Sequence, residues 1–204
     1  TPEILTQIFG SLDLTSDLES TFWFLILTLT FLFARAGNII PYTTSTFENN
    51  KHLLQQDIFK QDSDFLIKHS KTNQAAQRIL TLPVLAKESS PLNIVSAFNH
   101  KNSFHIYKKT SPAFLYSKNG KLITFTRQKF VKILRNKLQN LGHNPSFYSG
   151  HSCRRGGASW AFNANVTGEA IKAHGDWASQ CYLRYIELNI ASKLAVSQRM
   201  LAQI

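Results

Sequence analysis

His151 and Arg154 are three residues apart in the chain, and two tyrosines, Tyr182 and Tyr185, follow farther along. Residues at the first spacing share one face of a helix, so the imidazole and the guanidinium can act on the same group. An arginine holds phosphodiester oxygens with paired donors, a histidine moves a proton, and a tyrosine hydroxyl attacks phosphorus covalently. Together, these residue types predict breakage of a phosphodiester without a metal ion.

The positive charge of the chain is concentrated in one stretch. Twelve lysines and arginines and no acidic residue lie between Lys101 and Trp160, and the remaining residues are nearly neutral in sum. A stretch of one sign and this length predicts a surface for a polyanion, most simply nucleic acid. A solvated basic face without such a partner is the alternative interpretation.

Several other classes of protein do not fit the composition. The two cysteines, Cys153 and Cys181, have no disulfide or metal-site spacing, which favours a reducing compartment. The longest apolar run, residues 22–34, is too short to span a bilayer and predicts a buried helix. The sequence also lacks the acidic cluster that would bind two magnesium ions. We therefore expect no metal, no cofactor, no membrane partner and no small-molecule substrate.

The apolar spacing predicts a mostly helical α+β fold with a small three-stranded antiparallel sheet. A first helix opens at Pro2, and a buried helix covers about residues 17–35. Strands are expected at 53–59, 64–69 and 78–84, with polar turns at 61–63 and 71–74. A helix is expected from Pro91 to about residue 99, and residues 114–125 form either a hairpin or an irregular loop.

The second half of the chain is expected to be helical. Thr126 is a good N-cap for a helix to Leu141, in which one face packs and basic residues such as Lys129 and Lys132 can meet phosphates. Ser149 is a candidate cap for a helix that carries His151 and Arg154. Further helices are expected at about 167–174, 178–188 and 191–202.

These segments resemble the catalytic domain of tyrosine recombinases, the phage-integrase family. The resemblance is carried by HSCRRGGA at 151–158 and HGDWASQCYLRYI at 174–186. The residues of these two motifs are most similar to those of eukaryotic mobile-element members of the DIRS-like and Crypton-like kind. FARAGN at 33–38 resembles the first arginine motif of the family. Residues 67–74 resemble the hairpin that presents its catalytic lysine.

The resemblance implies a role for each matching residue. Arg35 and Arg154 would clamp the non-bridging oxygens of the phosphate, and His151 would donate to it or handle the proton of the tyrosine. Lys71 would protonate the departing 5′ oxygen, with Lys68 as second choice. Arg155 is assigned to a backbone phosphate or to an internal pair.

The nucleophile and the third histidine position depend on spacing. The family places its tyrosine nine residues after the position that follows a glycine, and counting from Asp176 gives Tyr185, so Tyr182 is expected to pack. The position that usually holds histidine or tryptophan is Asp176, flanked by His174 and Trp177. His174 is ranked slightly above Trp177 as the missing donor.

The implied protein is a site-specific DNA recombinase that cuts and rejoins DNA through a 3′-phosphotyrosyl link. It would be a single catalytic domain over 1–204, with a core to about residue 190 and a C-terminal helix at about 191–204 that docks on a neighbouring protomer. The N-terminal clamp domain of the family is expected to be missing. A homo-oligomer on double-stranded DNA is expected, in the nucleus for a eukaryotic mobile element and otherwise in the cytoplasm on DNA.

Three alternatives remain open from the sequence. The first is a domesticated DNA-binding protein that keeps the fold but does not cut. The second is a basic protein for acidic partners or membranes. The third is a topoisomerase-like relaxing enzyme.

Overall fold

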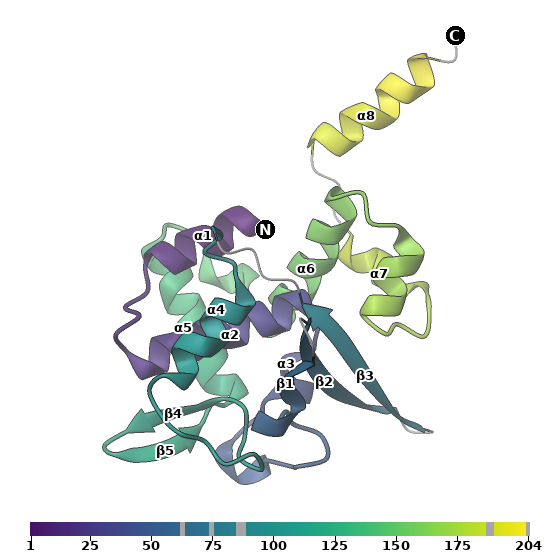
Figure 1. Ribbon diagram of the computed structural model, residues 1–204. Helices are drawn as coiled ribbons and strands as arrows, with labels where there is room; N and C mark the ends of the chain where they lie inside the picture. Colours follow the sequence, from purple (N-terminus) through teal and green to yellow (C-terminus); the bar gives the residue numbers. More distant parts are fainter. Residues whose placement is uncertain (62–63, 74–75, 85–88, 187–189, 203–204) are drawn as a thin grey trace.

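The computed structural model describes residues 1–61, 64–73, 76–84, 89–186 and 190–202, and most of them are helical (Figure 1). The α-helices are α1 (Pro2–Gly10), α2 (Asp17–Phe31), α3 (Ala36–Ile39), α4 (Ile94–Asn102), α5 (Arg127–Asn140), α6 (Ser152–Asn163), α7 (Gly168–His174) and α8 (Ile190–Leu201). Short 3-10 helices are η1 (Thr44–Thr46), η2 (Gln55–Asp57), η3 (Pro145–Phe147) and η4 (Gln180–Tyr185). None of the helices in the described part is long and apolar enough to cross a membrane.

Helix α2 forms the centre of the hydrophobic core. The hydroxyl of Ser16 caps it by accepting the backbone N–H of Glu19, and residues 20–30 are all buried. Helices α4 and α6 pack against it. The helix ends earlier than expected, because Phe33 adopts a left-handed backbone conformation with φ 46°, which a continuing α-helix does not allow. Arg35 is therefore not at the end of this helix but is the N-cap residue of α3.

The expected three-stranded antiparallel sheet is present beside α3, in the order β1 (Ile58–Gln61), β2 (Asp64–Asn73) and β3 (Ala76–Val84). Two predictions for the sheet need correction. Lys71 lies in β2, opposite Arg78 of β3, and not in a turn, because pairing continues to Asn73. The first strand begins at Ile58 and not at residue 53, because Gln55–Asp57 form the 3-10 helix η2. The parts of the predicted turns at 62–63 and 74–75 are outside the described residues.

The segment around residue 119 is a hairpin, which settles one alternative left open by the sequence. Strands β4 (Leu115–Lys118) and β5 (Lys121–Thr124) pair antiparallel. Asn119 and Gly120 between them both have positive φ, 52° and 75°, as the two-residue turn that matches strand twist requires.

Three further helix predictions differ from the structure. Helix α4 begins at Ile94, because the side chain of Asn93 caps it by accepting two backbone N–H groups. His151, expected inside a helix, is instead the N-cap residue of α6, and the hydroxyl of Ser149 accepts the N–H of His151. The segment expected to be helical at 178–188 is the 3-10 helix η4 up to Tyr185; residues 187 and 188 lie outside the described ranges. Helices α1, α5, α7 and α8 lie where the sequence predicted them.

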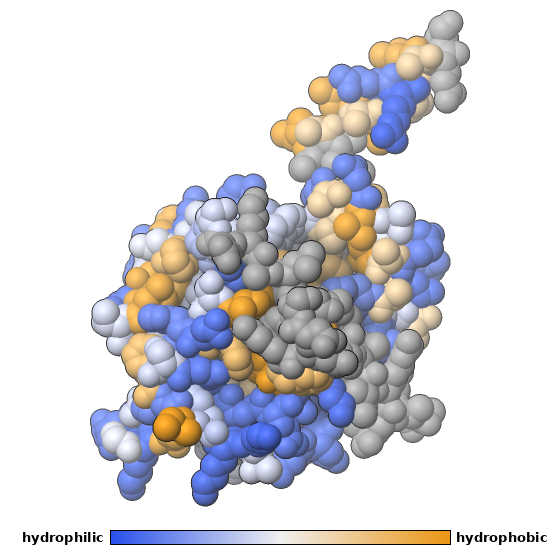
Figure 2. All heavy atoms as spheres, viewed as in Figure 1, coloured by the Kyte–Doolittle hydropathy of each residue, from blue (hydrophilic) through white to orange (hydrophobic). Residues whose placement is uncertain are grey.

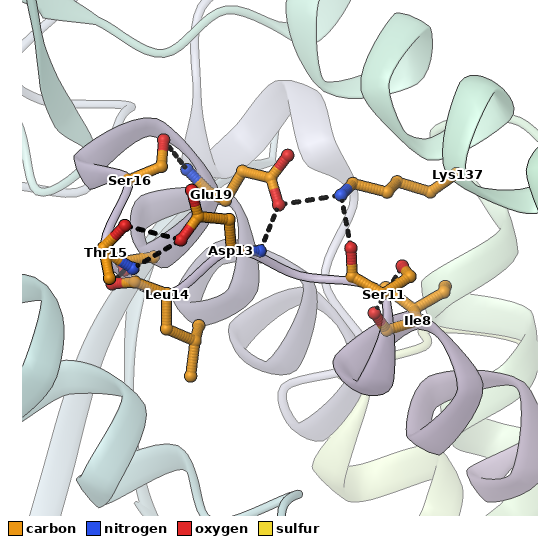
Figure 3. Close-up of polar contacts among 9 residues, drawn as sticks. Ile8, Ser11, Asp13, Leu14, Thr15, Ser16, Glu19 and Lys137 are labelled. Atoms are coloured by element: carbon orange, nitrogen blue, oxygen red, sulfur yellow. Dashed lines mark hydrogen bonds and ion pairs between the residues drawn. The ribbon is translucent and has the colours of Figure 1, made fainter.

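Two cations of the basic stretch are used inside the protein. Lys101 is fully buried, and its ammonium group donates to Asn102 and lies over the ring of Tyr107. Lys137 donates to the carboxylate of Glu19 at 2.7 Å and to the carbonyl of Ser11 at 2.8 Å, which joins α5 to the segment between α1 and α2 (Figure 3). The basic surface available to a partner is therefore smaller than the sequence suggested.

Helix α8 stands away from the body of the protein in Figure 1. Figure 2 shows apolar side chains exposed along it. The residues concerned are Ile190, Leu194, Val196, Met200 and Leu201, each at least half exposed. A helix with this much exposed apolar surface indicates a contact with another surface.

Candidate active site

Arg154 is held at the junction of three segments. It projects from α6, and its side chain is almost fully buried, with 4% of the residue exposed. One terminal nitrogen donates to the carbonyl of Phe33, in the turn after α2, and the other to the carbonyl of Gly175 at 3.1 Å, just after α7. The guanidinium thus ties together the two turns that border the site.

Trp177 covers this guanidinium. The carbon of the guanidinium lies 3.9 Å from the centre of the indole ring, a distance typical of a cation–π contact. The ring packs on Gly175 so closely that a Cβ there would be 1.7 Å from it. Neither Nε of Arg154 nor Nε1 of Trp177 has a hydrogen-bond partner among the described residues, although both atoms are buried. Two unused donors thus lie in contacting side chains.

Burial lowers the pKa of Arg154 to about 10, with a further contribution from the charge of Arg35. At neutral pH the guanidinium is still protonated, as an arginine that binds phosphate must be. The phenolate that Tyr185 would form on losing its proton and the carboxylate of Asp176 act on it in the opposite direction. Asp176 has a left-handed backbone conformation, with φ 47°, in the turn that carries Gly175 and Trp177.

Tyr185 lies beside this pair. It is half-buried, its ring centre is 5.9 Å from that of Trp177, and its phenol is close enough to interact electrostatically with Arg154. The hydroxyl of Ser159 on α6 donates to the backbone carbonyl of Tyr185. This hydrogen bond fixes the end of η4 against α6.

Tyr182 occupies a different environment on the same short helix. It is 5% exposed and belongs to a small apolar cluster with Phe33, Ala158, Ile171 and Trp177. Its hydroxyl is only 2.7 Å from the position that a Cβ on Gly168 would take. Tyr182 therefore packs η4 onto the first residue of α7.

His151 is surrounded by arginines. It is an exposed residue at the start of α6, and its pKa is lowered by partial burial first and then by the charges of Arg127, Arg35 and Arg154. The imidazole is consequently neutral at pH 7 and able to accept a proton. These three cations come from α5, from the cap of α3 and from α6.

Arg127 is the member of this group that the sequence did not single out. Its guanidinium lies 3.3 Å from the point where a Cβ on Gly150 would stand, next to the backbone that leads into His151. The signal in the sequence was its position directly after the N-cap Thr126, at the first residue of α5. Its charge alone did not distinguish it from Lys129 and Lys132.

His174 packs against Phe33 and the end of α2. Its Nε2 donates to the carbonyl of Phe31 at 2.6 Å, and its ring centre is 4.7 Å from that of Phe33. Of the two candidates for the missing donor, Trp177 is the one that contacts Arg154. His174 contacts the end of α2.

The remaining predicted residues are spread around this centre. Lys68 and Lys71 lie on β2, and Lys68 is exposed. Lys129 is half-buried and Lys132 exposed on α5, and Arg155 is exposed on α6. Within the described ranges, no three His, Cys, Asp or Glu side chains lie together as a metal ion would require.

Comparison with solved structures identifies the fold. The XerH site-specific recombinase, solved in a post-cleavage complex with a palindromic difH substrate, superposes with a TM-score of 0.67 at 12% identity over 96% of this chain. The XerA recombinase gives 0.66 at 14% identity over 98% of it. The integrase of the Tn1549 transposon, bound to circular intermediate DNA, gives 0.55 at 13% identity over 88% of it.

This chain has the fold of tyrosine recombinases. The fold class predicted from the sequence is confirmed by these matches. The chain covers 50% of the XerH chain, 62% of the XerA chain and 58% of the Tn1549 integrase chain. Comparison of the sequence with protein-family models and with curated proteins finds no match.

Proposed function

We propose that this chain is the catalytic domain of a DNA recombinase that breaks and rejoins strands through a tyrosine. The observation that carries the proposal is the placement of the half-buried Tyr185 beside the protonated Arg154, within the tyrosine-recombinase fold. The proposed substrate is double-stranded DNA. The solved structures of the same fold support this choice, because two of them hold a difH substrate and circular intermediate DNA.

In the proposed reaction, the hydroxyl oxygen of Tyr185 attacks the phosphorus of a DNA phosphodiester. The new bond is a 3′-phosphotyrosyl ester, and the bond that breaks is that to the 5′ oxygen. Neutral His151 accepts the phenolic proton, while Arg35 and Arg154 hold the non-bridging oxygens. Lys71 supplies a proton to the 5′ oxygen. Attack by another 5′-hydroxyl reverses the step, so the bond energy is retained and no cofactor is used.

The third donor and the wider context are parts of the same proposal. His174, with Trp177 as the alternative, completes the set of donors to the phosphate, and Arg155, Lys129 and Lys132 bind the flanking DNA backbone. The domain works as a homo-oligomer on DNA, with α8 as the element that joins protomers. We further propose a eukaryotic mobile element of the DIRS-like or Crypton-like kind, and thus the nucleus, as its origin.

A covalent-trapping experiment tests the chemistry. Purified protein is incubated with nicked suicide duplexes of varied sequence, and covalent protein–DNA adducts are resolved on a denaturing gel. We expect an adduct with the wild type and with Tyr182→Phe, and none with Tyr185→Phe. Tyr182→Phe is the matched control, because it removes a hydroxyl from the same short helix. An adduct that survives in Tyr185→Phe would contradict the proposed nucleophile.

One observation favours a second function, a DNA-binding protein that keeps the fold without cutting. The guanidinium of Arg154 donates hydrogen bonds to two backbone carbonyls and is covered by the ring of Trp177. A phosphate therefore reaches it only if this ring moves. Tight, salt-sensitive binding to duplex DNA without any adduct, in the wild type and in Trp177→Ala alike, would support this second function over the first.

A further inference from the structure

Arg127 is fixed at the meeting point of three segments. Thr126, directly before it, caps α5 by accepting the N–H of Lys129, and the backbone N–H of Arg127 donates to the carbonyl of Pro41 at 2.8 Å. The position that a Cβ on Gly150 would take, next to the guanidinium of Arg127, is also 3.5 Å from the Cβ of Ala36, the first residue of α3. The side chain therefore lies between the start of α5, the start of α3 and the backbone before α6.

The charges around this point are unbalanced. Every charged group that acts appreciably on His151 is an arginine, namely Arg127, Arg35 and Arg154. Three cations that converge on one imidazole from three elements repel one another, and an anion between them removes that repulsion. Arg154 is engaged with two carbonyls, whereas Arg35 is exposed and Arg127 half-buried at the surface.

We propose that Arg127 binds a backbone phosphate of the DNA at the mouth of the active site, together with Arg35 and His151. This inference rests on the proposed function, because it assumes that DNA enters at His151. Arg127 differs from Lys129 and Lys132 on the same helix in its contact with the segment that leads into His151. An arginine also offers planar paired donors that match phosphate, which a lysine does not.

Gly150 offers an independent way to test the geometry. The nearest atom to a Cβ at this position is Nε of Arg127, at 3.3 Å. The Gly150→Ala variant keeps every charge and must shift the guanidinium by a few tenths of an ångström. We expect it to weaken DNA binding less than Arg127→Ala does, without a change in the salt dependence, because the number of charges is the same.

The experiment measures equilibrium binding of the full chain to the nicked duplex over a range of salt concentrations, together with the rate of adduct formation. For Arg127→Ala we expect about tenfold weaker DNA binding and slower formation of the covalent adduct. The slope of the logarithm of affinity against the logarithm of salt concentration should be smaller by about one. Arg127→Lys should keep the salt slope and recover part of the affinity. Lys121→Ala is the charge-matched control, because this exposed lysine lies on the β4–β5 hairpin, away from α6 and α7 in Figure 1.

The outcomes separate this inference from the proposed function. If Arg127→Ala changes affinity and salt slope no more than Lys121→Ala does, the inference on Arg127 is wrong whatever the adduct assay gives. If the wild type forms no adduct but Arg127→Ala still lowers affinity and slope, the cutting function fails and the phosphate contact stands. If Arg127→Ala and Arg127→Lys both lower the melting temperature and reduce binding equally, Arg127 is only structural and the inference is overturned.

Discussion

Three arginines act on His151, and their combined charge affects which protonation state this residue has. The pKa of His151 is lowered by partial burial and by Arg127, Arg35 and Arg154. A lowered pKa means that the neutral form persists to a lower pH than in a free histidine. Protonation is thus disfavoured in the folded state, and its cost to stability appears as pH falls below the ordinary value of about 6.5.

The first prediction concerns this electrostatic effect. Arg127→Gln removes the charge that has the largest effect on the pKa of His151, so this pKa should rise toward its ordinary value. The measurement is an NMR titration of the His151 imidazole in the protein without DNA. Lys121→Gln serves as the control for loss of a distant charge. An unchanged His151 pKa in Arg127→Gln would show that the two groups do not interact.

The second prediction compares two neighbouring glycines of α6. A Cβ on Gly157 would stand 2.2 Å from the backbone oxygen of Thr30 and 2.7 Å from the ring of Phe33, so Gly157→Ala forces α6 away from α2. We expect a loss of about 1–3 kcal/mol in the free energy of unfolding. A Cβ on Gly156 meets nothing closer than 3.7 Å, and Gly156→Ala should stabilise the helix by up to about 1 kcal/mol. Urea denaturation measures the free energy of unfolding of both variants. Equal changes in the two variants would contradict the prediction.

At the scale of elements, the structure separates what local sequence decides from what tertiary contacts decide. The α5 cap and the buried α2 were predictable, because each depends on residues close in sequence. The hairpin at Asn119 was one of two alternatives that the sequence left open. The end of α2 was not predictable. Phe33 adopts a left-handed backbone conformation, and its carbonyl accepts a hydrogen bond from Arg154, which is 121 residues away in the sequence. No local sequence pattern contains that contact.

The candidate site shows the same division. Spacing singled out Tyr185 and Arg154, which the structure places near each other, but it did not reveal that Trp177 lies on Arg154. It also did not distinguish Arg127 from the other cations of α5, because its contact with Gly150 joins two separate segments. Residue types and order were thus readable from the sequence, whereas burial and convergence required the fold.

The third prediction concerns the cap of α5, the helix that carries Arg127. The hydroxyl of Thr126 accepts the N–H of Lys129 at 3.2 Å, which satisfies a backbone donor that the helix itself leaves unpaired. Thr126→Ala should cost about 1 kcal/mol of folding stability. Thr126→Ser keeps the hydroxyl and should retain most of that stability. Thermal or urea denaturation measures both, and an equal loss in the two variants would mean that the cap hydroxyl is not the cause.

At the scale of the whole molecule, two apolar features of the described residues are open to solvent, namely the exposed side of α8 and a groove. Helix α8 exposes Ile190, Leu194 and Leu201 at positions that fall on one side of a helix. A groove of about 440 Å³ lies between the end of α2, α6 and α7, and its lining includes Phe31 and Trp160. Under the proposed function, we expect α8 of a second copy of this chain to occupy this groove, because α8 projects from its own body and exposes apolar side chains (Figures 1 and 2).

The last prediction tests this exchange. Leu194→Asp combined with Leu201→Asp places two charges on the apolar side of α8, and burying them in the groove would be unfavourable. We expect the wild type to form assemblies on DNA that this variant does not form, while a single copy of the variant still binds the duplex. Sedimentation velocity of the protein–DNA complexes separates the two effects. Arg199→Asp is the control, because it changes the charge by the same two units at an exposed position on the opposite side of α8. If the double variant and the control assemble equally well, α8 is not the joining element, and the contact between copies must be formed by another surface.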